Sequence, residues 1–396
     1  MSGRKRVLML ASVASMIGQF NMHNLRLLLE IGYEVHVACN FREGNTCNAR
    51  SIQRLRKTLC GMRVVQHQWD CPRSICAPAQ CFKAYRQLRH LVLKYRFAWI
   101  HCHSPVGGAL ARLVGYPGGG RVIYTAHGFH FYRGAPFYYW LLYYPVEKAL
   151  SCWTDILITV NREDYQIAKR RLCAGKVYRI PGVGIDAYAA NGSNADGRQS
   201  FRAAYDIPAD AFVLLSVGEL SRRKNHQAVI RAVAALVNIS GREVYYVVCG
   251  QGAWKDRLYR MAQSYGIANR IRLVGFLEDV EQAYQSADLF VFPSLQEGLP
   301  AALMEAMAAG LPCVVSDIRG NRELIDAKGG RRFPAAGKRS KRRLVKALEE
   351  LLEDKALRQS CGSYNKKKAK AYDIQVVDRR MRDIYYKAFE RDTDKP

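Results

Sequence analysis

The sequence contains no apolar run of the roughly 18 residues that a membrane-spanning helix requires. Its N-terminus, MSGRKRVLMLASVASMIGQF, imitates a signal peptide because basic residues precede an apolar run, but no A-x-A-like cleavage site is evident. A polar loop and the strand-like stretch GYEVHVACN follow, so VLML is predicted to be the first strand of a fold. We therefore expect a cytoplasmic protein.

The sequence also lacks the residue spacing of a metal site. Its twelve cysteines are scattered, and the nearest approach to a cluster is Cys71, Cys76 and Cys81, with HCH further on at 101–103. Zinc ligands usually come in tighter C-x2–4-C pairs, so reduced cytosolic thiols are the favoured interpretation. No D-x-D motif follows a strand, because the letters DTD at 392–394 lie in the charged C-terminal tail. We expect neither a metal nor another cofactor to be required.

Acidic residues are scarce, above all in the first half of the chain. The 396 residues include 61 Lys and Arg but 34 Asp and Glu, which gives a net charge of +27. Between Gly44 and Val146 there are fourteen basic residues and one acid, Asp70, and a second basic stretch lies between Asp326 and Glu349. This imbalance predicts an anionic partner. Nucleic acid, an anionic membrane and a phosphate-bearing substrate are the three candidates.

What the sequence does contain is a regular alternation of strand and helix patterns. Apolar stretches such as RVLMLAS, RVIYTAH, FVLLSVGE and DLFVFPS are separated by helical patterns such as HQAVIRAVAALVNI. Such alternation predicts an α/β protein with doubly wound parallel sheets. A segment rich in Gly, Ala, Asn and Ser at 184–200 predicts a boundary between Rossmann-like domains at 1–185 and 186–371. Helical spacing of apolar residues in 372–396 predicts a C-terminal helix.

The stretch SLQEGLPAALMEAMAAGLPCVVSD, residues 294–317, combines a strongly apolar helix pattern with two carboxylates. Pro300 stands where a helix would have its first residue, a position that needs no N–H. Gly310 stands where a left-handed C-terminal residue is expected. A helix is therefore predicted from about Pro300 to Ala309.

The residues around the start of this helix suit a sugar nucleotide. Gly298 and Leu299 lie where free N–H groups and the helix dipole form an anion site. Glu305 can accept two hydrogen bonds from a ribose diol, and Glu297 can reach the hydroxyls of a transferred sugar. The structural alternative is that Glu305 balances the helix dipole. The order E-G-L-P-x4-E followed by A-x-A-x-G-x-P is more specific than two isolated glutamates, and it favours the sugar nucleotide.

With these motifs the sequence resembles the retaining glycosyltransferases of family 4, which have the GT-B fold. The resemblance rests on EGLPAALMEAMAAGLPCVVSD, whose Glu297 and Glu305 match the family's E-x7-E motif. It extends to VGELSRRKNH, CGQGAWKDRL, RLVGFLEDV, YTAHGF and PGVGID. It implies two Rossmann-like domains that face an interdomain cleft, with the C-terminal helix crossing back to the first domain.

More narrowly, HCHSPVGG, YTAHGFHFYRGAP and YYPVEKALSCWTDILITVNREDY are similar to enzymes of bacterial capsular and exopolysaccharide assembly. The resemblance implies transfer of a hexose or N-acetylhexosamine, with retention, from a UDP-sugar to an undecaprenyl-diphosphate-linked saccharide. Neither half offers a convincing carboxylate pair for a covalent route. We therefore expect a front-side substitution in which the departing diphosphate oxygen takes the acceptor proton.

The resemblance also assigns the cations of the site. Lys224 in RRKNH matches the family lysine that contacts the donor diphosphate, whereas Glu219 stands where the family often has an arginine. Arg222 or Arg223 is expected to replace the missing charge, because a leaving diphosphate gains negative charge that fixed cations stabilise. A solvated basic turn is the alternative for whichever arginine lies outside the site.

Four further positions follow from the same resemblance. His127 in YTAHGF faces the reacting centre in the family and is expected to hydrogen-bond the donor sugar or the developing charge. Gly18 corresponds to a loop that approaches the donor phosphate, and Gly252 of CGQG to a Gly-rich turn after a strand. Residues 277–280 correspond to a segment near the base.

Two stretches, FHFYRGAPFYYWLLYY at 129–144 and CFKAYRQLRHLVLKYRF at 81–97, combine aromatic with basic residues. They suit a membrane interface, and a buried aromatic core is the alternative. We hypothesise that this half docks peripherally on the anionic cytoplasmic face of the inner membrane. Two other functions stay open: a UDP-sugar epimerase or hydrolase of the same fold, and a nucleic-acid-binding protein. We expect no nucleic-acid partner, because no recognisable module accompanies the basic residues.

Overall fold

The computed structural model describes residues 5–43, 47–116, 118–188, 195–240 and 243–389. The DTD letters at 392–394 and the middle of the predicted boundary segment lie outside the described residues.

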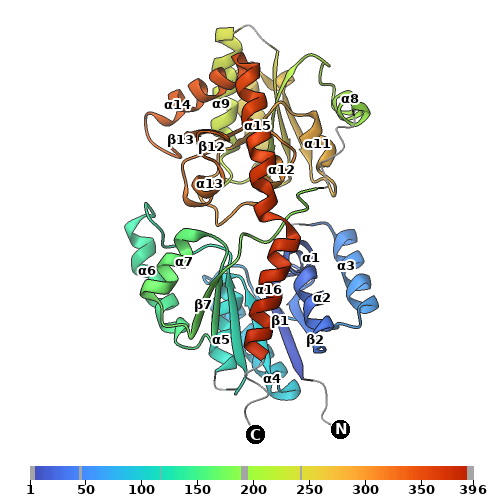
Figure 1. Cartoon of the computed structure of the whole chain (residues 1–396), viewed down its shortest axis with the longest axis vertical. Coiled ribbons are helices and arrows are strands. Elements are labelled where there is room, and N and C mark those ends of the chain that lie inside the picture. Colours follow the sequence, from blue (N-terminus) through green and yellow to red (C-terminus); the bar gives the residue numbers. More distant parts are fainter. Residues whose placement is uncertain (1–4, 44–46, 117, 189–194, 241–242, 390–396) are drawn as a thin grey trace. The chain divides into compact units, whose positions relative to one another are not determined.

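The chain forms two compact units (Figure 1). Unit 1 consists of Met1–Val183 and Gln375–Pro396, and unit 2 consists of Gly184–Ile374. The first division falls two residues before the predicted boundary after residue 185. The chain re-enters unit 1 after Ile374, whereas the sequence predicts the start of the C-terminal segment at 372.

Unit 1 is built on a seven-stranded sheet in the order β3-β2-β1-β4-β5-β6-β7. Every neighbouring pair is parallel, and the central strand β4 is buried at every position, as a sheet with helices on both faces requires. The elements are β1 (Arg6–Val13), α1 (Ala14–Phe20), α2 (Met22–Glu30), β2 (Glu34–Asn40), α3 (Ala49–Gly61), β3 (Val65–Gln68), α4 (Pro78–Tyr95), β4 (Trp99–His103), α5 (Pro105–Gly115), β5 (Arg121–Ala126), α6 (Phe137–Ser151), β6 (Ile156–Thr159), α7 (Arg162–Arg171), β7 (Lys176–Arg179) and α16 (Ile374–Phe389).

Unit 2 is built on a six-stranded parallel sheet in the order β10-β9-β8-β11-β12-β13. Its elements are α8 (Ala195–Ala204), β8 (Phe212–Val217), α9 (His226–Ser240), β9 (Val244–Cys249), α10 (Lys255–Ser264), η2 (Ala268–Arg270), β10 (Ile271–Gly275), α11 (Glu281–Ser286), β11 (Leu289–Phe292), α12 (Ala301–Ala308), β12 (Cys313–Ser316), α13 (Arg319–Leu324), β13 (Gly330–Phe333), α14 (Ser340–Glu353), α15 (Lys355–Ala369) and η3 (Lys370–Tyr372). Both units thus have the predicted doubly wound topology.

In each sheet the strand order reverses once, between β1 and β4 in unit 1 and between β8 and β11 in unit 2. Ligands of doubly wound sheets bind beyond the carboxyl ends of the strands at such a switch point. The loops that follow these four strands are therefore where a site is expected.

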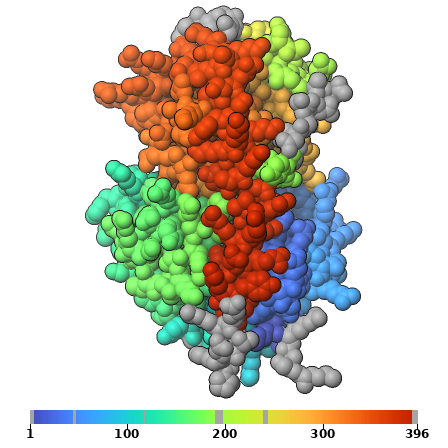
Figure 2. Space-filling view, viewed as in Figure 1, coloured from blue at the N-terminus to red at the C-terminus, as the bar shows by residue number. Residues whose placement is uncertain are grey.

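The C-terminal helix α16 packs within unit 1 and is drawn in red in Figure 2. It buries six side chains at helical spacing: Val377, Met381, Ile384, Tyr385, Ala388 and Phe389. The sequence pattern includes the first five of these and Ile374, which is partly buried. On its outer side, Arg382 donates to Glu30 of α2 over 2.6 Å. The helix therefore covers one face of the unit 1 sheet.

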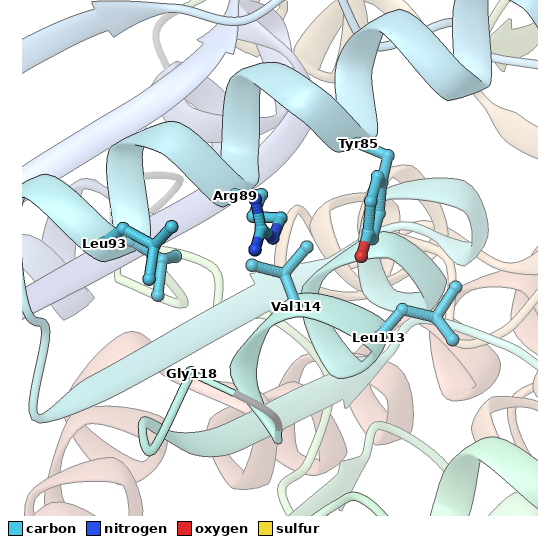
Figure 3. A pocket seen from close by; sticks show the side chains of 7 residues that line it. Tyr85, Arg89, Leu93, Leu113, Val114 and Gly118 are labelled. Atoms are coloured by element: carbon cyan, nitrogen blue, oxygen red, sulfur yellow. The ribbon is translucent and has the colours of Figure 1, made fainter.

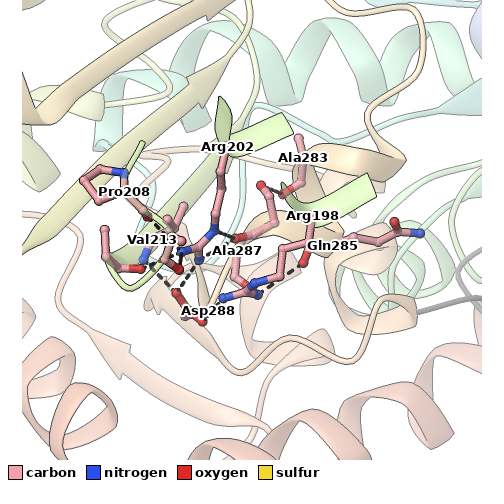
Figure 4. A network of polar contacts seen from close by, with 11 residues as sticks. Arg198, Arg202, Pro208, Val213, Ala283, Gln285, Ala287 and Asp288 are labelled. Carbon is pink, nitrogen blue, oxygen red and sulfur yellow. Dashed lines mark hydrogen bonds and ion pairs between the residues drawn. The ribbon is translucent and has the colours of Figure 1, made fainter. Parts of the chain in front are cut away.

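A buried arginine anchors α8 to the unit 2 sheet (Figure 4). The Arg202 side chain is 3% exposed and donates to the Asp288 carboxylate over 3.0 Å. It also donates to backbone carbonyls, including those of Ser286 and Ala211. Arg198 donates to the second oxygen of Asp288 over 2.9 Å. These bonds fix the first helix of unit 2 to the start of β11.

Among the helices of the described residues, none has both the length and the apolarity that crossing a bilayer would take.

Candidate active site

The loop between β11 and α12 lies at the switch point of unit 2. The helix α12 spans Ala301–Ala308 with Pro300 as its N-cap, so it begins one residue later than the sequence predicts. At the other end Gly310 has a φ of +76°, and Leu311 N–H donates to Ala306 O over 3.0 Å. This is the predicted left-handed helix end, in the form of a Schellman motif.

Glu297 in this loop pairs with two cations from the loop after β8. One carboxylate oxygen, Oε1, lies 2.8 Å from Lys224 Nζ and 2.8 Å from Arg223 Nη1. The Glu297 side chain is 10% exposed and that of Lys224 is 12% exposed. Burial by itself would raise the pKa of Glu297, but the charges of Lys224 and Arg223 outweigh burial and lower that pKa below its ordinary value. The switch point therefore holds an ionised carboxylate between two cations.

The two arginines beside Lys224 differ in their surroundings. Arg223 also donates to Gln296 O over 3.1 Å, and its own carbonyl accepts from Leu295 N–H. Arg222 is exposed, and within the described part of the chain it has no ion pair or hydrogen bond through its side chain. Lys224 also makes a cation–π contact, because its ammonium lies 4.8 Å from the centre of the Phe292 ring. Arg223 is thus the arginine that accompanies Lys224.

Glu305 lies half-buried on α12 and is paired with a tyrosine that the sequence did not single out. The Tyr284 hydroxyl donates to Glu305 Oε2 over 2.8 Å. Burial raises the pKa of Glu305, and the Tyr284 hydrogen bond lowers it in part. Among the described residues, the other carboxyl oxygen, Oε1, accepts no hydrogen bond. Tyr284 belongs to α11, directly after the 277–280 segment that the resemblance puts near a base.

The predicted backbone contacts of the anion site are available. The N–H groups of Gly298 and Leu299 have no hydrogen-bond partner in the part of the chain that is described, and the Leu299 residue is buried. The carbonyl of Glu297 accepts from Arg319 Nε over 3.0 Å, a second contact that the sequence did not suggest. Gly252 has a packing reason of its own, because a Cβ there would lie 2.4 Å from Leu220 O.

In unit 1, His127 follows β5 and is half-buried. Its Nε2 lies 3.0 Å from Nδ1 of His103 on β4. Burial lowers the pKa of His127 to about 4, so its ring is neutral at neutral pH. His103, like its neighbour His101, was singled out in the sequence as a distant metal-ligand candidate. Both are buried on β4 instead.

Gly18 does not lie in a loop, contrary to the prediction. It is an exposed residue inside α1, which begins directly after β1, and a Cβ there would meet the side chain of Leu55 at 3.4 Å. The family that the sequence resembles commonly has paired glycines here and this chain has one, whose cost in a helix is only about 1 kcal/mol.

The switch point of unit 1 carries two serines that the sequence analysis missed. Ser12 Oγ at the end of β1 lies 2.6 Å from Ser104 Oγ after β4. Ser104 has a φ of +68° and a ψ of 150°, a conformation that costs a residue other than glycine about 1–3 kcal/mol and clusters at functional sites. This strain marks the carboxyl edge of the sheet beside His127.

The cysteines do not form a metal site in the described residues. No group of three or more His, Cys, Asp and Glu there is arranged to hold a metal ion, and all twelve cysteines are free thiols. A cavity of about 80 Å³ lies between α4 and α5, lined by residues that include Tyr85, Arg89 and Leu113 (Figure 3). Gly118, which precedes β5, also lines it. The cavity therefore lies toward the amino end of β5, away from the edge where doubly wound sheets bind ligands.

Two family models match the chain and together cover most of it. The model described as "Glycosyltransferase Family 4" matches residues 19–186, and the model described as "Glycosyl transferases group 1" matches residues 197–368. The two matches correspond closely to unit 1 and unit 2.

Curated relatives match over long stretches. EpsD of Bacillus subtilis (strain 168), whose own glycosyltransferase assignment is provisional, is 33% identical over 98% of both chains. The UDP-Gal:alpha-D-GlcNAc-diphosphoundecaprenol alpha-1,3-galactosyltransferase of Escherichia coli is 29% identical over 65% of this chain and 69% of its own length. Both relatives align across most of their length.

Among solved structures, Alr3699/HepE of Anabaena in complex with UDP and glucose superposes with a TM-score of 0.76 at 15% identity, over 97% of this chain and all of the other. WaaG, a glycosyltransferase involved in lipopolysaccharide biosynthesis, superposes with a TM-score of 0.73 at 18% identity, over 96% of this chain and 99% of its own. At these identities the likeness concerns the fold alone, which is GT-B.

Proposed function

The chain belongs to the glycosyltransferases of family 4 with the GT-B fold, and from that premise we propose that it transfers a hexose or N-acetylhexosamine from a UDP-sugar, with retention, to an undecaprenyl-diphosphate-linked saccharide in exopolysaccharide or capsule assembly. The observation that carries the proposal is the cluster of Lys224, Arg223 and Glu297 beside the N–H groups of Gly298 and Leu299, which have no partner among the described residues. The Escherichia coli relative supports the donor and acceptor classes, since its name gives UDP-Gal and a diphosphoundecaprenol-linked GlcNAc.

Lys224 and Arg223 supply the positive charge that a leaving diphosphate needs. When the bond between the sugar's anomeric carbon and the UDP oxygen breaks, the electron pair stays on the diphosphate, where fixed cations lower the barrier. The acceptor hydroxyl oxygen forms the new bond on the same face and passes its proton to the departing diphosphate oxygen. The cations are held by Glu297 before the donor arrives, so little reorganisation is needed.

The backbone N–H groups of Gly298 and Leu299 complete the diphosphate site. They precede a helix whose dipole favours an anion at this end. Gly252 lies on the loop after β9. Because it has no side chain, its backbone can pack closely against the neighbouring loop after β8. Glu297, with its ionised carboxylate, accepts from hydroxyls of the transferred sugar.

Glu305 binds the ribose. Its Oε2 is taken by the Tyr284 hydroxyl, which fixes the carboxylate, and its Oε1 is left to accept from a ribose hydroxyl. A hydrogen bond to a charged group contributes about 1.5–3 kcal/mol. The two glutamates of the E-x7-E motif thereby grip different parts of one donor.

The test is binding and turnover with a panel of UDP-sugars. We expect UDP and one or a few UDP-sugars to protect the protein against heat, and Glu305→Ala to abolish that protection while the circular dichroism spectrum stays unchanged. Arg222→Ala, which alters an exposed side chain without an ion pair in the described residues, is the matched control. Absence of any UDP-sugar response would refute the proposal, and release of free sugar without an acceptor would favour the epimerase or hydrolase instead.

The acceptor's lipid requires a membrane, and α6 is the part of unit 1 that suits one. We propose that α6 inserts its apolar side chains at the cytoplasmic face of the inner membrane. Of the fifteen residues of α6, Leu150 and Ser151 are buried, whereas Phe137 is 80%, Leu141 64% and Leu142 60% exposed. Large apolar side chains exposed together on one helix of a basic half support contact with an anionic bilayer.

A further inference from the structure

The HCH stretch of β4 holds a chain of histidine contacts that reaches His127. His101 and His103 are two residues apart, so both point to one face of the sheet, and their ring centroids are 4.4 Å apart. His101 has both nitrogens occupied, one by the Tyr385 hydroxyl and one by Thr125 Oγ1, each at 2.8 Å. His103 is the ring that contacts His127 directly.

The second nitrogen of His103 decides which hydrogens these rings carry. His103 Nε2 lies 3.2 Å from the thioether sulfur of Met9 on β1. A thioether can accept a hydrogen bond but has no hydrogen to donate. His103 Nε2 therefore carries the N–H and donates to Met9 Sδ.

The remaining assignments follow from charge. Burial lowers the pKa of His103 well below its ordinary value, so the ring is neutral and carries one N–H only. Its Nδ1 is then an acceptor, and His127 Nε2, 3.0 Å away, must be the donor. His127 is itself neutral, which leaves its Nδ1 with a lone pair.

We propose that Met9 and His103 are positioning residues that hold His127 as its Nε2–H tautomer, so that Nδ1 of His127 offers a lone pair to the ligand. The group that meets His127 must then be a hydrogen-bond donor, such as a hydroxyl or an amide N–H of a saccharide. A fully ionised phosphate oxygen, which can only accept, is excluded at this position. The identity of the ligand rests on the proposed function, whereas the tautomer does not.

The tautomer can be observed in the ligand-free protein. With histidine selectively labelled with 15N, the two-bond 1H–15N correlation pattern of each ring distinguishes the tautomers, and His127→Gln assigns the His127 signal. We expect the Nε2–H form in the wild type. In Met9→Leu, which removes the acceptor while nearly conserving volume, we expect a shift toward the Nδ1–H form. Met307→Leu on α12 is the matched control. Met307 is also fully buried, but it belongs to unit 2, whereas the histidines belong to unit 1.

The functional consequence separates this proposal from the previous one. UDP lacks the saccharide, so its affinity should be the same in the wild type and Met9→Leu, while kcat/KM for sugar transfer should fall about tenfold, as the loss of one hydrogen bond implies. An Nδ1–H tautomer in the wild type would overturn the proposal. So would a Met9→Leu protein with unchanged tautomer, or one with a shifted tautomer and unchanged turnover. Failure to bind UDP in every variant would count against the proposed function and leave the tautomer result standing.

Discussion

Lys224 is the residue whose charge matters most to the proposed leaving-group stabilisation, because it is mostly buried and bonded to Glu297. Lys224→Met keeps an aliphatic stem against Phe292 but removes the charge. We expect UDP affinity, measured by calorimetry, to fall about 10- to 100-fold, since a hydrogen bond to a charged group contributes about 1.5–3 kcal/mol. Arg222→Ala should change it by less than about twofold. A larger loss for Arg222→Ala than for Lys224→Met would transfer the role to Arg222.

Tyr284 gives the ribose contact a measurable pH dependence. Its hydroxyl lowers the pKa of Glu305, which burial raises, so Tyr284→Phe should raise that pKa further. Binding to a carboxylate is present above its pKa and is lost as the pH falls through it. UDP affinity in Tyr284→Phe should therefore be lost at a higher pH than in the wild type, in a calorimetric series from mildly alkaline to acidic pH.

Tyr364→Phe provides the control for this series, because it also removes a hydroxyl bonded to a carboxylate in unit 2, that of Asp326, but outside the site. Its pH profile should match that of the wild type. The ribose contact assigned to Glu305 would be contradicted if the pH at which UDP affinity is half lost were unchanged or lower in Tyr284→Phe than in the wild type.

Among the elements, α6 buries few residues for its length and contains one partner of a buried ion pair. Glu147 on α6 binds the guanidinium of Arg112 on α5 through both carboxylate oxygens. The Arg112 side chain is 1% exposed, and its guanidinium lies 4.2 Å from the centre of the Tyr124 ring. Together with the packing of Trp140 and Tyr144 against Phe131, this pair fastens the helix to unit 1.

Glu147→Gln should consequently loosen α6 selectively. It leaves the Arg112 charge buried without its partner, which costs about 3–5 kcal/mol of unfolding free energy. Hydrogen–deuterium exchange should accelerate in the amides of α6 and much less in those of β1. Glu350→Gln, which breaks the more exposed pair with Arg331, should cost about 0–1 kcal/mol. Equal costs for the two variants would show that α6 is held by other contacts.

The sequence predicted those elements whose signal is contained within a few neighbouring residues. Strands with continuous apolar runs and the helix end at Gly310 depend on neighbouring residues, so they could be read from the sequence. The strand WIHCH at 99–103 was missed, although it is central and buried, because two histidines interrupt its apolar pattern. VQHQ at 65–68 was missed because it is a half-exposed edge strand.

The site was predicted where the motif is contiguous and left open where contacts are long-range. Glu297 and Glu305 stand eight residues apart in one segment, and they lie where the sequence places them, Glu297 on the β11–α12 loop and Glu305 on α12. The choice between Arg222 and Arg223 depended on a contact across more than seventy residues, and the partner Tyr284 comes from another helix. No local pattern reports such pairings, and roles for these residues remain predictions.

For the whole molecule, the charge that the reaction needs comes from the protein in our proposal. Lys224 and Arg223 are aimed at the diphosphate, so transfer should proceed without a divalent cation. We expect kcat to be unchanged after exhaustive treatment with EDTA, in an assay that follows UDP release. Loss of turnover that added Mg²⁺ or Mn²⁺ restores would contradict this expectation and would call for a metal beside the diphosphate.

In the membrane proposal, the net charge of +27 attracts the protein to the anionic membrane surface. Each Lys or Arg near an anionic surface contributes about 1 kcal/mol, and the contribution is screened by salt. Apolar side chains of α6 add a contribution that salt does not screen. The two contributions can therefore be separated by ionic strength, which also distinguishes a membrane from nucleic acid.

The purified protein should float with phosphatidylglycerol-containing vesicles at low salt and less with phosphatidylcholine vesicles. The double variant Leu141→Ser, Leu142→Ser should weaken flotation at both low and high salt, because it removes apolar contacts. Tyr259→Ser with Tyr265→Ser, which alters about half-exposed rings on unit 2, should leave flotation unchanged. Indifference to anionic vesicles at low salt would remove the docking proposal. Tight, salt-sensitive binding to oligonucleotides without vesicle binding would instead assign the basic surface to nucleic acid.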